Sequence, residues 1–395
     1  MATKQVVIVG AGPAGMMLAY QLASNGVKVR VLERHPDFER EFRGELVQGS
    51  NVEQLKKAGI FQVLLDRGLA IPDIERRMFL GHKRQVAVPG PKEIGAVISQ
   101  PGFLGLLHEL CGKFPEYKLD FSSPVLEAIQ ENGRVVAVKT KVGRVDGDLF
   151  IVCNGRNSPL RKSFGLETET FATTADALWL RFDLSSDPGA LPTSLDVHMF
   201  GHGVVTVTQP TSRQRLHIAY SAPGDLAALR RDIPELKRRL LPTLNERIRK
   251  HVDAQLNEKT EMQVLKIIVD SVKSWYAPGL LFLGDAAHTM SPSGGQGLNV
   301  AIRDTYVAAN HLVPALKNGA SIDDGVFQKI QAERQTEIRA IQARQTRAGQ
   351  MVLKPLGVLH VMFTMLLLAM KLMKKLRAAD GIPPPQPNFL SPVAR

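Results

Sequence analysis

Short apolar runs alternate with helical patterns at the start of the chain. Residues 6–9 are all apolar, residues 16–23 carry apolar side chains at helical spacing, and residues 27–32 form a second strand-like segment. A short apolar run bounded by turn residues is typical of a buried strand, and a 3.6-residue period is typical of a helix packed on one face. The order strand, helix, strand predicts a βαβ unit and hence a parallel sheet.

The pattern changes between about residues 173 and 270. Four segments there alternate apolar with polar side chains, as half-buried antiparallel strands do: 178–184, 195–200, 204–208 and 216–222. Polar, basic helical stretches follow at 225–239 and 242–256, and an apolar segment at 264–269 leads back toward the first region. We therefore expect an antiparallel sheet inserted into the parallel fold.

The remaining pattern predicts two helices and three strands between these regions. The helices are expected at 50–65, with Ser50 as a candidate N-cap, and at 103–114. The strands are expected around the turn Glu131-Asn132-Gly133, at 125–129, 135–140 and 149–152.

Glycines follow the first apolar run in a spacing that suits a dinucleotide. The turn consists of Gly10, Ala11, Gly12, Pro13, Ala14 and Gly15. Gly10 allows a tight turn, Gly12 lets the backbone approach a pyrophosphate, and Gly15 lets helix and strand pack closely. Glu33 ends the second strand, where a carboxylate can bind ribose hydroxyls.

A second strand–turn–helix unit lies near residue 285. Residues 280–283 are apolar, Asp285 follows them, and a helical pattern begins at Leu298. The loop between them contains Pro292 and several glycines, and such a loop leaves helix N–H groups free to face an anion or a carbonyl-rich ring. Open α/β sheets hold their ligands at such strand ends.

Together the two motifs carry a family resemblance. The stretch from Gly284-Asp285 through Pro292 to Gly294-Gly295-Gln296-Gly297-Leu298-Asn299 resembles the second flavin motif of the single-component (class A) FAD monooxygenases, the para-hydroxybenzoate hydroxylase-like family. The resemblance implies that Asp285 binds the ribityl chain and that the backbone of Gly297, Leu298 and Asn299 meets the flavin ring. It implies that the first motif, with Glu33, binds the rest of a non-covalent FAD.

Three further places match the family pattern in part. Arg43 stands where members commonly have an arginine that reaches FAD, with a solvated loop cation as the alternative. Gln100 stands where members often place Gln or Arg against the diphosphate-ribose region, with a helix-entry residue as the alternative. Asn154 and Leu160 stand where the third signature usually has Asp and Val, so the chain keeps an acceptor there but loses its charge.

The resemblance implies a reaction. NAD(P)H reduces FAD, O₂ adds to give a C4a-hydroperoxide, and one oxygen passes to a lipophilic aromatic substrate such as a phenol, quinone, quinolone or polyketide. Candidates for catalytic roles are His198, His217 and Tyr220 on the middle strands and Pro292 in the flavin loop, although a lone histidine on a half-buried strand is more often structural. The alternatives are a flavin-dependent reductase of isoprenoid double bonds and an FAD-binding protein without monooxygenase activity.

The implied fold is α/β: a Rossmann-like FAD-binding domain with an inserted antiparallel substrate domain and a C-terminal helical region. We expect the FAD-binding domain in three parts and the substrate domain in two, followed by helices and a flexible tail. In chain order the segments are 1–75 (FAD), 76–100 (substrate), 101–172 (FAD), 173–270 (substrate), 271–320 (FAD), 321–380 (helices) and 381–395 (tail).

The composition limits the kinds of partner that we expect. The net charge is +12, yet 6% of residues are aromatic and no nucleic-acid motif appears, so we expect no nucleic-acid partner. Cys111 and Cys153 lie in apolar contexts without metal-ligand spacing, which predicts buried thiols and no metal. The start of the chain shows no signal-peptide pattern, so we expect a cytoplasmic protein, with association with a membrane face left open.

The C-terminal part holds an apolar segment at residues 355–370, followed by Lys371, Lys374, Lys375 and Arg377. A transmembrane helix needs about 20 apolar residues, so spanning is not expected. Three interpretations stay open: a helix packed on the core, a helix lying in the plane of a membrane with basic anchors, and a lid over a lipophilic substrate tunnel.

Overall fold

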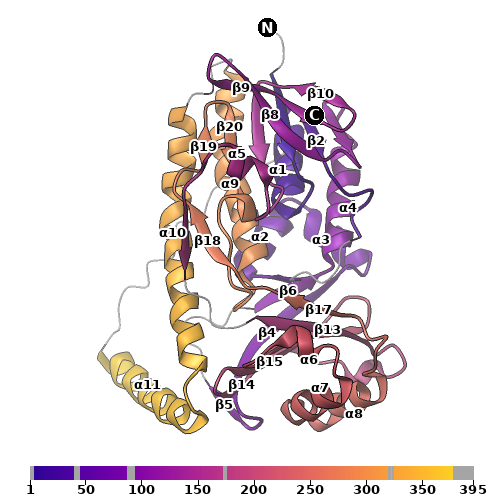
Figure 1. Cartoon of the computed structure of the whole chain (residues 1–395), viewed down its shortest axis with the longest axis vertical. Coiled ribbons are helices and arrows are strands. Elements are labelled where there is room, and N and C mark those ends of the chain that lie inside the picture. The colour runs from indigo at the N-terminus through magenta and orange to yellow at the C-terminus, as the bar shows by residue number, and fades with distance from the viewer. Residues whose placement is uncertain are drawn as a thin grey trace.

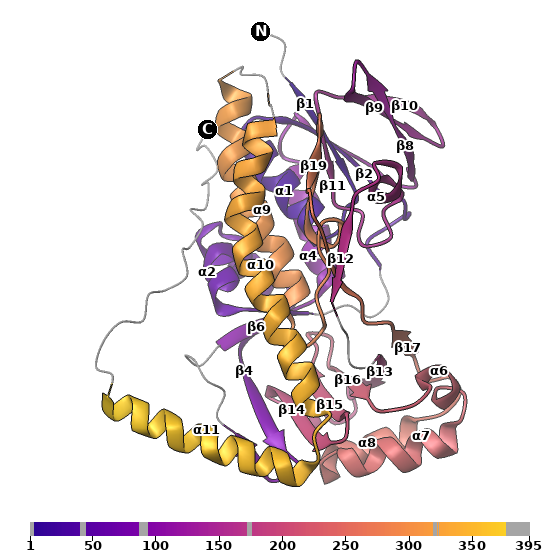
Figure 2. The same cartoon turned by 60° about the vertical axis from the view of Figure 1, so that its left-hand side comes forward.

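The structure is a computed structural model that describes residues 4–39, 45–86, 94–171, 176–318, 322 and 324–376, the last seven of these by their backbone alone. Arg43 and the predicted tail at 381–395 lie outside the described residues. Two sheets occupy the two ends of the molecule, and one long helix, α10 (Asp324–Val352), runs between them (Figures 1 and 2).

The first sheet has six strands and is parallel except at one edge. Its order is β19 (Tyr276–Ala277), β20 (Leu280–Phe282), β11 (Leu149–Val152), β1 (Gln5–Val9), β2 (Lys28–Leu32) and β7 (Tyr117–Asp120). Only β19 is antiparallel to its neighbour. The predicted βαβ unit is therefore present, because β1 and β2 pair in parallel and α1 (Pro13–Ser24) connects them.

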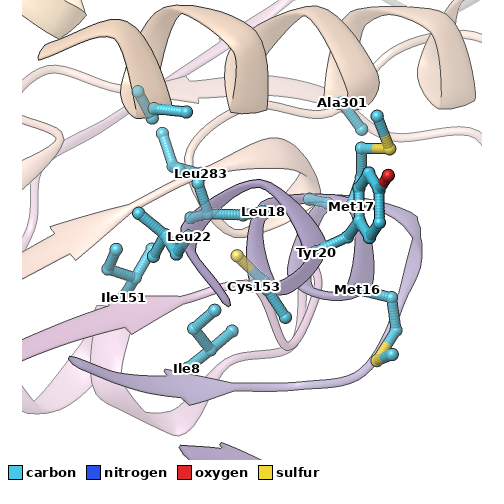
Figure 3. Packing of buried hydrophobic residues seen from close by; sticks show 14 of the residues in the cluster. Ile8, Met16, Met17, Leu18, Tyr20, Leu22, Ile151, Cys153, Leu283 and Ala301 are labelled. Atoms are coloured by element: carbon cyan, nitrogen blue, oxygen red, sulfur yellow. The ribbon is translucent and has the colours of Figure 1, made fainter. Parts of the chain in front are cut away.

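The main core forms around α1, which is buried along almost its whole length. Helix α1 contacts both α4 (Gln100–Cys111) and α9 (Gln296–Lys317). Figure 3 shows Leu18 and Leu22 of α1 packed toward Ile151 and Leu283, at the strand layer. Burying such side chains contributes about 1.5–3 kcal/mol each, so this layer fixes where the strand ends meet.

The second sheet has nine strands. Its order is β17 (Met262–Leu265), β13 (Ala177–Asp183), β16 (Arg215–Ser221), β15 (Val204–Pro210), β14 (Ser194–Gly201), β4 (Ala70–Leu80), β6 (Ile94–Ile98) and β3 (Leu46–Val47), with β5 (Arg84–Val86) paired to β4. All pairings are antiparallel except that of β14 with β4.

One face of this sheet is covered by short helices. They pack on a separate core that includes Leu180, Ile218 and Tyr220. The covering elements are α6 (Leu226–Leu229), α7 (Ile233–Leu240), η2 (Leu241–Thr243) and α8 (Glu246–Gln255). The other face turns toward the six-stranded half.

The other elements complete the described fold. They are α2 (Gly49–Lys57), α3 (Ile60–Asp66), the sheet β10 (Gly143–Asp146), β9 (Arg134–Thr140) and β8 (Val125–Glu131), α5 (Pro159–Ser163), the pair β12 (Thr168–Phe171) and β18 (Val269–Val272), η1 (Pro188–Ala190), η3 (Gly284–Ala286) and α11 (Leu356–Leu376). The predicted fold class is confirmed.

Two predicted boundaries are wrong. The single helix expected at 50–65 is two helices, because Gly59 adopts the left-handed φ of 71° and ends α2. Helix α4 begins at Gln100, since the Ser99 hydroxyl accepts the Gly102 N–H and caps it. The apolar segment at 264–269 spans the end of β17, in the nine-stranded sheet, and the start of β18, which pairs with β12.

Candidate functional site

The first glycine turn is shaped by close backbone contacts. A Cβ on Gly15 would lie 1.9 Å from the carbonyl oxygen of Gly10, and one on Gly10, where φ is +103°, would lie 2.7 Å from the Cα of Asn154. Neither position therefore accepts a side chain. Gly12 differs, because the nearest atom to a Cβ there is 4.0 Å away. Space is thus open in front of the first turn of α1.

This end of α1 suits an anion. Pro13 occupies the first turn, and no side chain in the described part of the chain caps the helix start. The N–H groups of Ala14 and Gly15 therefore keep the direction and partial positive charge that bind a phosphate.

Glu33 lies beside the same turn and is 2% exposed. Its Oε2 accepts the Ala11 N–H at 2.6 Å, and its Oε1 accepts the His35 N–H at 3.0 Å. The carboxylate thus joins the end of β2 to the glycine turn after β1. A carboxylate has about four acceptor sites, so a ribose contact at Glu33 stays a prediction.

Asp285 sits in the turn η3, directly after β20. It is exposed, whereas every other residue from 280 to 289 is buried. A Cβ on Gly284 would lie 3.2 Å from the Cβ of Ala14 and 3.5 Å from that of Ala301. The turn therefore packs directly on the first turn of α1 and on α9.

Helix α9 begins at a second open turn. Gly294 and Gly295 have φ of +81° and +63°, no side chain in the described residues caps the helix, and a Cβ on Gly297 would meet nothing within 4 Å. Leu298 is half-buried there. Pro292 is exposed, and its carbonyl accepts the Gly295 N–H at 2.9 Å.

Asn299 is used differently, since its side chain is fully buried. Its Oδ1 accepts the N–H of Gln48 at 2.7 Å, and its Nδ2 donates to the carbonyls of Leu46 and Gly295 at 2.9 and 2.7 Å. The amide therefore joins the start of α9 to β3. Any contact of Asn299 with a cofactor would come from its backbone, as the resemblance implies.

Taken together, these features fit the binding of FAD. The turn at Gly284 contacts Ala14, and Gly10 contacts Asn154, so the ends of three neighbouring strands meet at the start of α1. The Oδ1 of Asn154 is buried without a hydrogen-bond partner among the described residues, and so leaves an acceptor unsatisfied at this junction. Two uncapped helix starts, an exposed carboxylate and an orphaned amide oxygen are the donors and acceptors that a dinucleotide requires.

A buried ion cluster stabilises the backbone at this junction. Asp304 of α9 is 0% exposed and accepts from the Gly284 N–H at 3.1 Å and from Arg334 Nε at 2.8 Å, and its Oδ2 lies 2.7 Å from His288 Nε2. Burial alone would raise the pKa of Asp304, but His288 and Arg334 outweigh burial and lower it. Asp304 therefore stays charged and fixes the turn that carries Asp285.

Helix α10 clamps the loop after this turn. Gln342 Nε2 donates to the carbonyls of Asp270 and Thr289, and Gln345 binds both Ser291, through its N–H and carbonyl, and the carbonyl of Ser293. These bonds set the path of the backbone on either side of Pro292. In the third signature, Arg161 pairs with Asp270 at 3.0 Å, and both side chains are about 10% exposed.

The candidate catalytic residues lie on opposite faces of the nine-stranded sheet. His198 and Tyr220 are both paired with Thr206, whose hydroxyl bonds to Thr243 of η2, so all three face the helical layer. His198 also stacks on Phe79 at 4.6 Å. Their placement turns both side chains away from the flavin loop.

His217 belongs to the other face, the one turned toward the FAD-binding half. Its Nε2 accepts a hydrogen bond from Arg181 Nε at 3.1 Å. Burial, with Arg181 and Arg215 nearby, lowers its pKa to about 3. His217 is therefore neutral near pH 7 and is too weak a base to deprotonate a phenol there.

Gln100 lines a small polar cleft between the halves. The cleft is bounded by Glu45 and Gln100 on one side and by Arg181, Arg213 and His217 on the other. Glu45 Oε2 is buried without a hydrogen-bond partner among the described residues. Burial raises the pKa of Glu45 to about 7, although Arg181 and Arg213 act in the opposite direction. Within the described residues, no group of three or more His, Cys, Asp or Glu could hold a metal ion.

Comparison with known proteins identifies the family. A family described as "FAD binding domain" matches residues 3–344. The chain belongs to this FAD-binding family.

Relatives of the flavoprotein act on aromatic rings. The 6-methylpretetramide 4-monooxygenase of Streptomyces rimosus is 28% identical over 358 residues, which cover 86% of this chain and 83% of the relative. The para-nitrophenol 4-monooxygenase of Pseudomonas sp. (strain WBC-3) is 24% identical over 329 residues, which cover 80% and 79%. The flavoprotein is thus an FAD-dependent aromatic monooxygenase, and the resemblance seen in the sequence is confirmed.

Solved structures share its fold. The crystal structure of P. aeruginosa PqsL in complex with 2-aminobenzoylacetate superposes with a TM-score of 0.77 at 19% identity, covering 88% of this chain and 96% of that one.

Sequence reasoning missed the residues that position the flavoprotein's FAD motifs. Asp304 and Arg334 lie 30 positions apart on separate helices, and nothing local marks them as a pair. Gln345 is one of many polar residues on α10, and Glu45 lies two residues from Arg43, which drew attention through the family pattern. One local signal did point to an ion pair. Asp304 lies on an otherwise apolar face of α9, and a carboxylate in such a position needs a buried partner.

Replacing Asp285 with alanine should weaken FAD binding. A charge-assisted hydrogen bond is worth about 1.5–3 kcal/mol, so we expect a roughly 10- to 150-fold rise in Kd for FAD, measured by fluorescence titration of the apoprotein. The control is Asp253→Ala, which removes an exposed carboxylate on α8 paired with Lys237 and should leave the Kd unchanged. Unchanged FAD affinity in Asp285→Ala would show that the second motif is misplaced.

Replacing Glu45 with glutamine should change the pH dependence of stability. Because the folded pKa of about 7 exceeds the ordinary 4.5, the stability that Glu45 contributes is complete below pH 4.5 and is lost as the pH rises through 7. At about 1.4 kcal/mol per pKa unit, the free energy of unfolding of Glu45→Gln apoprotein should exceed that of the parent by ~1–3 kcal/mol at pH 8 and by much less at pH 5. Urea denaturation measures both.

The matched control is Glu39→Gln, which alters an exposed carboxylate on the same cleft. It should give no difference that depends on pH. An equal effect of Glu45→Gln at pH 5 and pH 8 would show that its carboxyl is not desolvated.

Proposed function

We propose that this monooxygenase uses NAD(P)H and O₂ to hydroxylate a lipophilic aromatic substrate, a phenol, quinone, quinolone or polyketide-like ring. The observation that carries the proposal is an apolar face of the nine-stranded sheet beside the flavin loop. Val197 pairs with Val207 on one side and with Met78 on the other, so these three side chains share a face. All three are half-buried, and Met78 also packs against the cluster that includes Leu359 and Phe363 of α11. On the opposite face, the residues of β13 and β16 are covered by helices.

The contacts of this face support a position next to the flavin. Val197 and Val207 pack against a buried cluster that includes Leu46. Leu46 lies 3.3 Å from where a Cβ on Gly295 would stand, and Arg76, on the same face as Val197, lies 3.1 Å from the corresponding point on Gly294. An apolar surface with Arg76 at its edge suits an aromatic substrate that carries a phenolate, carboxylate or enolate.

The roles of the residues follow from this arrangement. The starts of α1 and α9 and the Asp285 carboxylate would hold FAD, which when bound supplies the electron transfer and oxygen activation of the reaction. Val197, Val207 and Met78 would exclude water from the substrate side of the ring. Trp179 shares this face with Val207 through Ala219, and its buried Nε1 has no hydrogen-bond partner among the described residues, so it offers a donor to a substrate oxygen.

The names of relatives support the substrate class. The names of two relatives give 6-methylpretetramide and para-nitrophenol, and the PqsL structure is a complex with 2-aminobenzoylacetate, which favours an aromatic substrate. Use of NAD(P)H rests on the family resemblance. We further propose a cytoplasmic setting, with Cys111 and Cys153 as buried free thiols.

Substrate-stimulated NAD(P)H oxidation tests the proposal. Heat-denatured protein should release FAD into the supernatant, because the proposed binding is non-covalent. The intact holoprotein should consume NADPH or NADH and O₂ faster when a phenol, quinolone or polycyclic polyketide aromatic is present, by ~10-fold or more. With ¹⁸O₂, the product should gain one labelled oxygen by mass spectrometry.

Three outcomes would contradict it. Flavin that stays oxidised with both nicotinamides would indicate an FAD-binding protein without this activity. Anaerobic reduction of an isoprenoid double bond would indicate the reductase. FMN in the supernatant, or colour kept by the precipitate, would contradict non-covalent FAD.

A further inference from the structure

Helix α11 is held to the nine-stranded sheet along one edge. Leu359 and Phe363 are 0% and 5% exposed and pack against a small cluster with Leu80, Val86 and Met199. On the same side, Arg84 donates to the Thr364 hydroxyl at 2.6 Å, and its Nη1 lies 2.7 Å from His360 Nδ1. The two polar side chains in this part of α11 therefore both meet Arg84.

The start of α11 is also fixed by backbone contacts. In the β14–β15 hairpin, the N–H of His202 donates to the carbonyl of Lys354, and that of Gly203 donates to the carbonyl of Val352. A Cβ on Gly201 would lie 2.5 Å from the backbone nitrogen of Leu356. Helix α11 is thus presented in a set orientation, across the end of the molecule away from the six-stranded sheet (Figures 1 and 2).

The opposite face of α11 is apolar and exposed. At 100° per residue, Val358, Val361, Met365 and Leu368 lie on the side turned away from Leu359 and Phe363. Their exposures run from 43% to 64%. Core packing therefore does not account for this face, and four exposed apolar side chains together are unusual on a protein surface in water.

The sequence interval around α11 carries only positive charges. Between Glu337 and Asp380 the sequence contains no Asp or Glu. The basic residues in that interval are Arg339, Arg344, Arg347, Lys354, Lys371, Lys374, Lys375 and Arg377. The first four are exposed. None of the helices in the described part of the chain has the length and apolarity needed to cross a membrane.

We propose that α11 docks this enzyme on an anionic lipid surface, lying in the plane of the membrane with its exposed apolar face between the headgroups. An exposed apolar helix face followed by lysines is suited to binding at this depth. Anionic headgroups neutralise the basic interval, whereas a second copy of the chain on the same face would bring like charges together. Helix α11 packs on β14 and β4. Docking therefore places the nine-stranded sheet, which carries the proposed substrate face, next to a lipid layer in which lipophilic compounds dissolve.

Vesicle co-sedimentation of the FAD-loaded, full-length protein tests this proposal. The protein should bind phosphatidylcholine vesicles that contain phosphatidylglycerol, and raised salt should weaken the binding. The variant Val361→Asn/Met365→Asn/Leu368→Asn should lose at least about 100-fold in partition coefficient. It should keep the FAD content and melting temperature of the parent, since these side chains contact solvent. Lys371→Ser/Lys374→Ser/Lys375→Ser should lose about 10-fold or more.

The matched control is Val142→Asn. Val142 is 79% exposed in the turn between β9 and β10, at the other end of the molecule, and its replacement should not change vesicle binding. Equal vesicle binding by the parent and the triple asparagine variant would overturn the proposal. So would a parent protein that ignores anionic vesicles but forms a dimer, seen by light scattering, that the triple variant loses, because a second copy would then cover the face.

Discussion

The buried carboxylate of Asp304 is the constraint on which the FAD-binding half depends. It meets the Gly284 N–H, His288 and Arg334 at one point without access to water. Removing one partner from a buried, hydrogen-bonded charge costs about 3–5 kcal/mol, which is comparable to the whole stability of many domains. The turn that carries Asp285 can therefore take its place only when α9 and α10 are both docked.

Other contacts also fix the path of the backbone around the candidate FAD site. Gly10 lets the end of β11 approach the turn after β1, and Gly15 lets α1 approach the same turn. A side chain at either glycine would collide with backbone atoms. Asn299 ties α9 to β3, and Gln345 ties α10 to the loop around Pro292. Side chains outside the FAD motifs thus position motifs that would bind largely through backbone N–H groups. The chemistry of the site lies in this geometry more than in any single reactive residue.

The sequence predicted the parts whose physical cause is local. The two glycine turns follow from sterics within a few residues, and alternation identified the antiparallel strands. It could not say which face of a strand points to the flavin, because a shift of one residue moves every side chain to the other face. His198 and Tyr220 were therefore equal candidates with His217 until the pairing with Thr206 placed them under the helices.

Other features depended on contacts that are distant in sequence. The pairing of Asp304 with Arg334 crosses two helices, and the orientation of α11 depends on Arg84. Neither contact can be recognised from the local sequence pattern. Gly59 shows the opposite case, since a glycine inside a helical pattern was a local signal whose effect, the end of α2, was underestimated.

Hydrogen exchange of the apoprotein with and without FAD tests the central claim, that FAD lies where the three strand ends meet the starts of α1 and α9. The first-turn N–H groups of these helices have no partner within their own helix, so they should exchange fast in the apoprotein. Added FAD should slow exchange together in peptides covering residues 10–15, 153–155 and 284–299. Protection confined to one of these segments, or found only elsewhere in the chain, would contradict the account.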